Sequence, residues 1–100
     1  MDTRHRKTHA RIMRASAPIL AAVLKHAGSS SQAVDIARDA AERIVAASDD
    51  PLHDAVIAAS VAAMMPMSDD MLTLEIIRAA SAVRLLDMDV QMISCRKVTA

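Results

Sequence analysis

The sequence predicts an all-α protein, a compact four-helix bundle with a basic, mobile N-terminal tail. Alanine accounts for 21 of the 100 residues, and the chain holds one Gly and no Phe, Tyr or Trp. This composition disfavours a β-sheet protein, which normally uses aromatic and β-branched strands and Gly-rich turns. Apolar residues also recur at helical spacing along the chain. The length suits a single domain, and one Cys excludes an internal disulfide.

Basic residues concentrate near the N-terminus. Residues 1–26 hold six of the twelve Lys and Arg against one acid, so this segment carries about +5 and the remainder about −5. Residues 1–9 have no apolar side chain after the first Met, so we assign them to a basic flexible tail and residues 10–100 to a single helical domain. Five side chains of this basic arm are candidates for contacting phosphates: Arg4, Arg6, Lys7, Arg11 and Arg14.

Pro18 determines where the first helix is expected to begin. Proline disfavours helical backbone at the preceding residue, which makes Ser16 the expected N-cap of a helix over residues 17–27. An alternative, in which residues 10–17 extend this helix through the proline, stays open. Gly28 is expected to adopt the left-handed conformation that commonly ends a helix.

Two further helices follow from their cap signals. A run of serines precedes an amphipathic segment and predicts a helix over residues 32–47. Asp50 before Pro51 is a strong start signal, since the acid accepts free backbone N–H groups and proline needs none at that position. The helix that follows, over residues 51–65, is apolar on nearly every face, which predicts a buried core helix.

The fourth predicted helix, over residues 69–92, is the longest and carries two apolar stripes. The first stripe repeats at alternating spacings of four and three residues, as in a coiled-coil seam: Leu72, Ile76, Ala79, Val83, Leu86, Val90 and Ile93. The second stripe lies on the opposite side: Leu74, Ile77, Ser81, Leu85, Met88 and Met92. One small monomer can hardly cover both, so we expect a homodimer that uses the second stripe. The alternative is a monomeric bundle in which the first and third helices cover one stripe each.

The sequence offers little for catalysis or cofactor binding. A single Gly excludes Gly-rich phosphate loops, and the lone Cys95 lies in no recognisable nucleophile context. Four methionines crowd around Pro66 and could bind Cu(I) through their thioethers, but His and Cys are missing nearby, so core filling is the expectation. We therefore expect no enzyme activity, no cofactor and no metal.

These observations favour a non-enzymatic protein–protein interaction module that self-associates and docks a protein partner through apolar helix surfaces. The alternative is a small regulatory protein that binds nucleic acid through its basic arm, although no aromatic side chain is present for base stacking. The sequence contains no apolar run of 18 residues, so no membrane span is expected. A cytoplasmic location is the expectation for a chain with one thiol.

Overall fold

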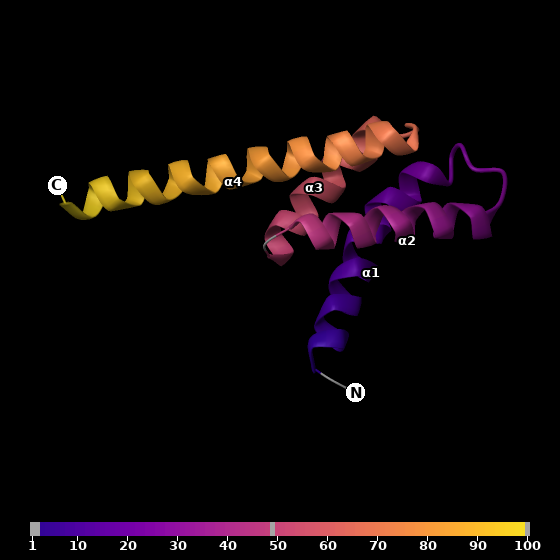
Figure 1. Ribbon diagram of the computed structural model, residues 1–100, viewed down its shortest axis with the longest axis horizontal. Coiled ribbons are helices and arrows are strands. Elements are labelled where there is room, and N and C mark those ends of the chain that lie inside the picture. Colours follow the sequence, from indigo (N-terminus) through magenta and orange to yellow (C-terminus); the bar gives the residue numbers. More distant parts are fainter. Residues whose placement is uncertain (1–2, 49, 100) are drawn as a thin grey trace.

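A computed structural model of the chain confirms the all-α, four-helix fold. It describes the backbone of residues 3–48 and 50–99 and the side chains of residues 6–48 and 50–86. The four helices are α1 (Thr3–Val23), α2 (Ser30–Ala47), α3 (Pro51–Met64) and α4 (Asp69–Thr99). As Figure 1 shows, α3 connects the layer that contains α1 and α2 with the long α4. None of these helices, over the residues described, combines the length and apolar character needed to cross a membrane.

Side chains cap the helices where the sequence predicts starts. The Ser29 hydroxyl accepts a hydrogen bond from the Gln32 N–H at 3.1 Å at the start of α2. Asp50 accepts two backbone N–H bonds, from Leu52 at 2.8 Å and His53 at 3.0 Å, at the start of α3. These bonds satisfy donors that lack intrahelical partners, so local side chains determine where α2 and α3 begin.

The core is formed by α1, α2 and α3 together with the first half of α4, which packs on α2 and α3. Its largest fully buried side chains are Ile19, Ile44, Ile57 and Val61. The α2 positions that face them are mostly alanine, namely Ala33, Ala37, Ala40 and Ala41. Small side chains on one face let neighbouring helices approach closely, so this protein builds its core from short contacts rather than from aromatic rings.

The first helix is longer than the main prediction and agrees with the alternative in which residues 10–17 extend it through Pro18. It begins at Thr3 and passes through Pro18, so the described part of the proposed tail, residues 3–9, is helical. Ser16 is therefore not an N-cap, and its hydroxyl donates to the Met13 carbonyl inside the helix at 2.8 Å. Ala15 and Ile19 on either side of the proline are buried, and their packing outweighs the backbone bond that proline cannot make.

The α1–α2 connection also differs from the prediction. α1 ends at Val23, and a turn follows in which the N–H groups of His26 and Ala27 both donate to the Val23 carbonyl. Gly28 has no positive φ, so the expected left-handed helix ending is wrong. Its N–H instead donates to the Gln32 side chain at 3.3 Å, which ties the turn to the start of α2.

The third helix is buried on one face only. Asp54, Ile57, Ala58 and Val61 face the core. Leu52 is 79% exposed, and Val56 and Met64 are about half exposed. The prediction of a fully buried core helix is therefore wrong, because only two other elements and one half of α4 are available to pack around it.

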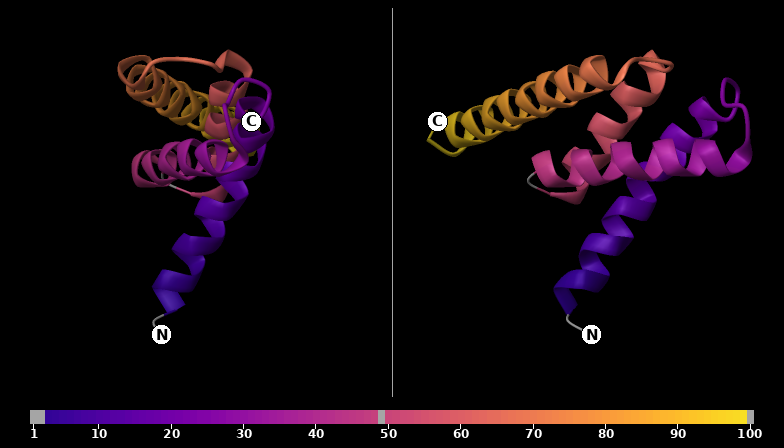
Figure 2. Two further views of the ribbon diagram at one scale, coloured as in Figure 1. Left: turned by 90° about the vertical axis from the view of Figure 1, so that its right-hand side faces the viewer. Right: turned by 45° about the vertical axis from the view of Figure 1, so that its right-hand side comes forward.

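Two helix ends project from the bundle. Figures 1 and 2 show the N-terminal half of α1 leading away from the body in one direction and the C-terminal half of α4 leading away in another. The Cα radius of gyration is 15.5 Å, against about 13 Å for an average domain of this length. The protein is thus a small packed core with two helical extensions.

Candidate self-association surface

The second stripe of α4 is exposed along its described length. Leu74 is 63% exposed, Ile77 56% and Leu85 64%, and Ser81 is exposed between them. The side chains of Met88 and Met92, the last two predicted positions, lie outside the described residues. The structure therefore brings the four described members of the predicted interface onto one solvent-facing side of a single helix.

The first stripe is buried at the opposite side of the same helix. Leu72, Ile76, Ala79 and Val83 are all less than a tenth exposed and pack against the core. In the described chain α4 contacts α2 and α3 but not α1. The alternative in which the first and third helices cover one stripe each is therefore not what the fold shows, since the described members of the second stripe stay exposed.

The first stripe also continues beyond the part of α4 that packs against the core. Leu86 continues its spacing but is 63% exposed, and Figure 1 shows the C-terminal half of α4 extending past α2 and α3. Arg84 lies close to where the packing of α4 on α2 ends, and its guanidinium donates to the carbonyl of Ala47, the last residue of α2, at 2.9 Å. Val90 and Ile93 fall beyond this point, and their side chains lie outside the described residues.

A buried carboxylate anchors α4 beside the exposed stripe. Glu75 is 6% exposed and accepts hydrogen bonds from the Ser60 hydroxyl of α3 at 2.8 Å and from Arg78 at 2.6 and 3.0 Å. The bonds from Arg78 are the main cause of a lowered Glu75 pKa; burial opposes them and Ser60 assists them. The ion pair therefore stays charged at neutral pH and orients Arg78 toward solvent at the rim of a pocket.

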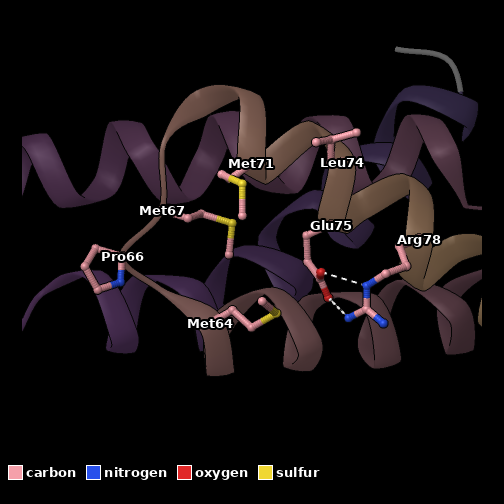
Figure 3. Close-up of a pocket in the computed structure, with 7 residues that line it drawn as sticks. All are labelled: Met64, Pro66, Met67, Met71, Leu74, Glu75 and Arg78. Carbon is pink, nitrogen blue, oxygen red and sulfur yellow. Dashed lines mark hydrogen bonds and ion pairs between the residues drawn. The ribbon is translucent and has the colours of Figure 1, made fainter.

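This pocket is open, apolar and rich in methionine (Figure 3). Its volume is about 440 Å³, and it lies between the end of α3, the loop that follows and the first turns of α4. Its lining residues are Met64, Pro66, Met67, Met71, Leu74, Glu75 and Arg78. We call it the methionine pocket. Leu74 belongs both to this pocket and to the second stripe, so the two features form one continuous apolar surface.

The methionines around Pro66 divide between two roles. Met65 and Met67 are partly buried and pack against the core, as expected of residues that fill gaps in a protein without aromatic rings. Met64 and Met71 are about half exposed at the mouth of the pocket. Across the described residues, no group of three or more His, Cys, Asp or Glu side chains could hold a metal ion.

The predicted phosphate-contacting residues do not all face solvent. Arg6, Lys7 and Arg14 are exposed on α1, and the side chain of Arg4 lies outside the described residues. Arg11 is instead held by Asp54 of α3, with Nε to Oδ2 at 2.7 Å and Nη2 to Oδ1 at 3.0 Å. These hydrogen bonds raise the pKa of Arg11 above its ordinary value, and partial burial opposes them. Arg11 is thus committed to a structural contact.

Sequence reasoning missed Asp54 and Glu75 as organising residues. Glu75 lies between Leu74 and Ile76, Asp54 is followed by the apolar residues 55–59, and each carboxylate is less than a tenth exposed. A buried carboxylate requires a cation or several donors, so an isolated acid on an apolar face is a signal for a partner elsewhere in the chain. The partner of Asp54 is Arg11, and the partners of Glu75 are Ser60 and Arg78. These partners could not be located without the fold.

Comparison of the chain with protein-family models, with curated proteins and with solved structures finds no match.

Proposed function

We propose that this chain is a non-enzymatic helical interaction module that self-associates through the second stripe of α4 and docks a protein partner on its remaining apolar surface. One observation carries the proposal. A single helix buries one apolar stripe in the core and presents a second, equally apolar stripe to solvent, with Leu74, Ile77 and Leu85 each more than half exposed. The simplest assembly that covers such a face is a homodimer.

The physical argument rests on the contiguity of the exposed side chains. Isolated exposed aliphatic residues are normal on a protein surface, but a continuous row on one face marks an interaction site. Burying one large aliphatic side chain stabilises an assembly by about 1.5–3 kcal/mol. The row on α4 therefore offers enough free energy to oppose the entropy lost when two copies associate.

The methionine pocket supports the partner-binding part of the proposal. Met64 and Met71 present flexible, polarisable thioethers at its mouth, and such side chains repack around differently shaped apolar groups. An amphipathic helix that inserts one apolar residue into the pocket would place its polar side near Arg78 at the rim. The expected setting is the cytoplasm, where a lone thiol stays reduced.

Light-scattering mass of the wild type and of Leu85→Asp tests self-association. An aspartate at position 85 of the second stripe would be buried without a partner in a dimer, so the variant should elute as a monomer with unchanged helical content. The control is Leu24→Asp, which makes the same change at a 50%-exposed leucine in the turn after α1. Loss of self-association in both variants, or in neither, would contradict the assignment to α4.

Nucleic-acid binding by α1 is a second candidate, supported by one observation. Because α1 is helical from Thr3, the seven-residue spacing of Lys7 and Arg14 places both on one side of a projecting helix, with Arg11 between them. A basic stripe of this kind suits contact with a phosphate backbone. The commitment of Arg11 to Asp54 removes one charge from the stripe, so we rank this function second.

Duplex binding at several salt concentrations tests the second candidate. Replacing Arg6, Lys7 and Arg14 with alanine should weaken binding and reduce the salt dependence by roughly 0.9 logarithmic units for each phosphate that the protein no longer neutralises. The variant Arg38→Ala, which removes an exposed charge from α2, should bind like the wild type. Equal salt dependence in the triple variant and the wild type would refute binding through α1.

A further inference from the structure

Five of the six members of the second stripe of α4 are placed symmetrically about Ser81. Leu74 and Met88 lie seven residues on either side of Ser81, and Ile77 and Leu85 lie four residues on either side. At about 100° per residue, all five positions fall within an arc of about 80° centred on Ser81. These five positions are therefore symmetric about Ser81 both along the helix and around it, whereas Met92, the sixth member of the stripe, has Asp70 as its counterpart.

We propose that two copies of this chain pair antiparallel through α4, with the two-fold axis of the dimer passing beside Ser81. This inference rests on the proposed self-association and specifies its geometry. In an isologous contact the same patch meets itself, so Ile77 would lie against the partner's Leu85 and Leu74 against the partner's Met88. Ser81 would meet the partner's Ser81, and this small side chain at the axis allows close approach of the two helices.

The projecting end of α4 favours the antiparallel direction. The helix continues to Thr99 beyond the last contacts with α2, an extension of about 20 Å from Leu86. In an antiparallel pair this extension runs over the first turns of the partner's α4. In a parallel pair each extension would lie beside the other extension and would not reach the body of the partner.

Charge at the two ends of α4 favours the same direction. The first turn of the helix contains Asp69 and Asp70, and the sequence places Arg96 and Lys97 near its end. Antiparallel pairing about Ser81 brings the acidic start of one helix beside the basic end of the other, and it also opposes the two helix dipoles. Parallel pairing would place the acids of one copy beside those of the other.

The exposed area is sufficient for such a contact. The chain exposes 6934 Å², whereas a compact monomer of 10.7 kDa exposes about 5500 Å². The excess of about 1400 Å² exceeds the share of about 800 Å² that each partner contributes to a stable protein–protein interface. The projecting ends of α1 and α4 both contribute to this excess, and a second copy on α4 would cover the part that α4 contributes.

Disulfide cross-linking tests the register. In a Cys95→Ser background, Ser81→Cys should form a disulfide-linked dimer under mild oxidation, because residues at a two-fold axis come within bonding distance of each other. Ile77→Cys alone should not cross-link, since the two copies of residue 77 would lie about 12 Å apart along the helix. A mixture of Ile77→Cys with Leu85→Cys should cross-link to give the mixed dimer.

The outcomes separate the register from self-association itself. Efficient cross-linking of Ile77→Cys, Ser81→Cys and Leu85→Cys each with itself would show a parallel pair, which overturns the antiparallel register and leaves self-association intact. A protein that has dimer mass but fails to cross-link at Ser81→Cys would overturn the axis at Ser81. A monomeric mass together with no cross-linking would overturn both proposals.

Discussion

Arg11 and Asp54, 43 residues apart in the sequence, form a two-pronged ion pair that fixes the N-terminal half of α1 against the start of α3. The Asp54 side chain is 4% exposed and the Arg11 side chain 23% exposed. Two parallel N–H to oxygen bonds of this kind are among the stronger polar contacts in proteins and impose a definite geometry. This contact holds the part of α1 that precedes Pro18, which the main sequence prediction leaves outside the first helix, against α3.

Replacing Arg11 with alanine should destabilise the fold by about 2 kcal/mol, because it leaves the buried Asp54 carboxylate without its cation. Urea unfolding followed by circular dichroism measures the change. The double variant Arg11→Met with Asp54→Leu should recover most of the missing stability, since it removes both charges and keeps apolar packing. If the stability lost by the double variant equalled the sum of the losses of the two single variants, the ion pair would not act as a unit.

Acid should weaken the anchor that Glu75 provides. Its pKa in the folded state is lowered from the usual 4.5, chiefly by the hydrogen bonds from Arg78. The contribution of Glu75 is therefore present above pH 4.5 and is lost as the pH falls through its lower folded-state pKa. Asp50, whose pKa is also lowered by backbone N–H bonds, contributes to acid unfolding in the same direction.

Comparison with Glu75→Gln isolates the contribution of this one carboxylate. Thermal unfolding at a series of pH values should show the wild type more stable than Glu75→Gln at neutral pH, with the difference shrinking below pH 4.5. The Asp50 contribution is common to both proteins and cancels. A difference in melting temperature that stays constant from neutral to acidic pH would rule out the charged state of Glu75 as its cause.

Two isoleucines should respond very differently to truncation. Ile57→Ala removes a fully buried side chain from the centre of the core and should cost about 3 kcal/mol of unfolding free energy. Ile77→Ala truncates a 56%-exposed side chain on the second stripe and should change the stability of one subunit by less than about 0.5 kcal/mol. Urea unfolding of both in a Leu85→Asp background excludes any effect of self-association. Equal losses would contradict the placement of the second stripe outside the core.

The sequence alone predicts the four-helix fold and both stripes of α4, because apolar spacing and helix caps are local signals. Ser29 and Asp50 act as the predicted caps, and Leu72 to Val83 occupy the predicted buried side. The beginning of α1 was not predictable, since the proline signal at Pro18 is local and the contact that outweighs it lies on α3. Helix propensity is overridden when distant packing supplies more free energy than the local preference.

The second stripe also shows what the sequence alone cannot predict. Its periodicity was visible in the sequence, but whether another helix of the chain covers it depends on how α1 and α3 pack. Leu86 illustrates the point, because it matches the spacing of the buried stripe yet is 63% exposed where α4 passes the end of the bundle. Spacing predicts which residues share a face, and only the fold determines whether that face has a neighbour.

Sedimentation equilibrium of the wild-type chain tests the central claim most directly, because it reports assembly without any substitution. Over about a hundredfold range of concentration, the mass should rise from that of one chain, 10.7 kDa, to twice that value and then level off. A mass that stays at 10.7 kDa across the whole range would contradict the claim that the second stripe of α4 is a self-association surface.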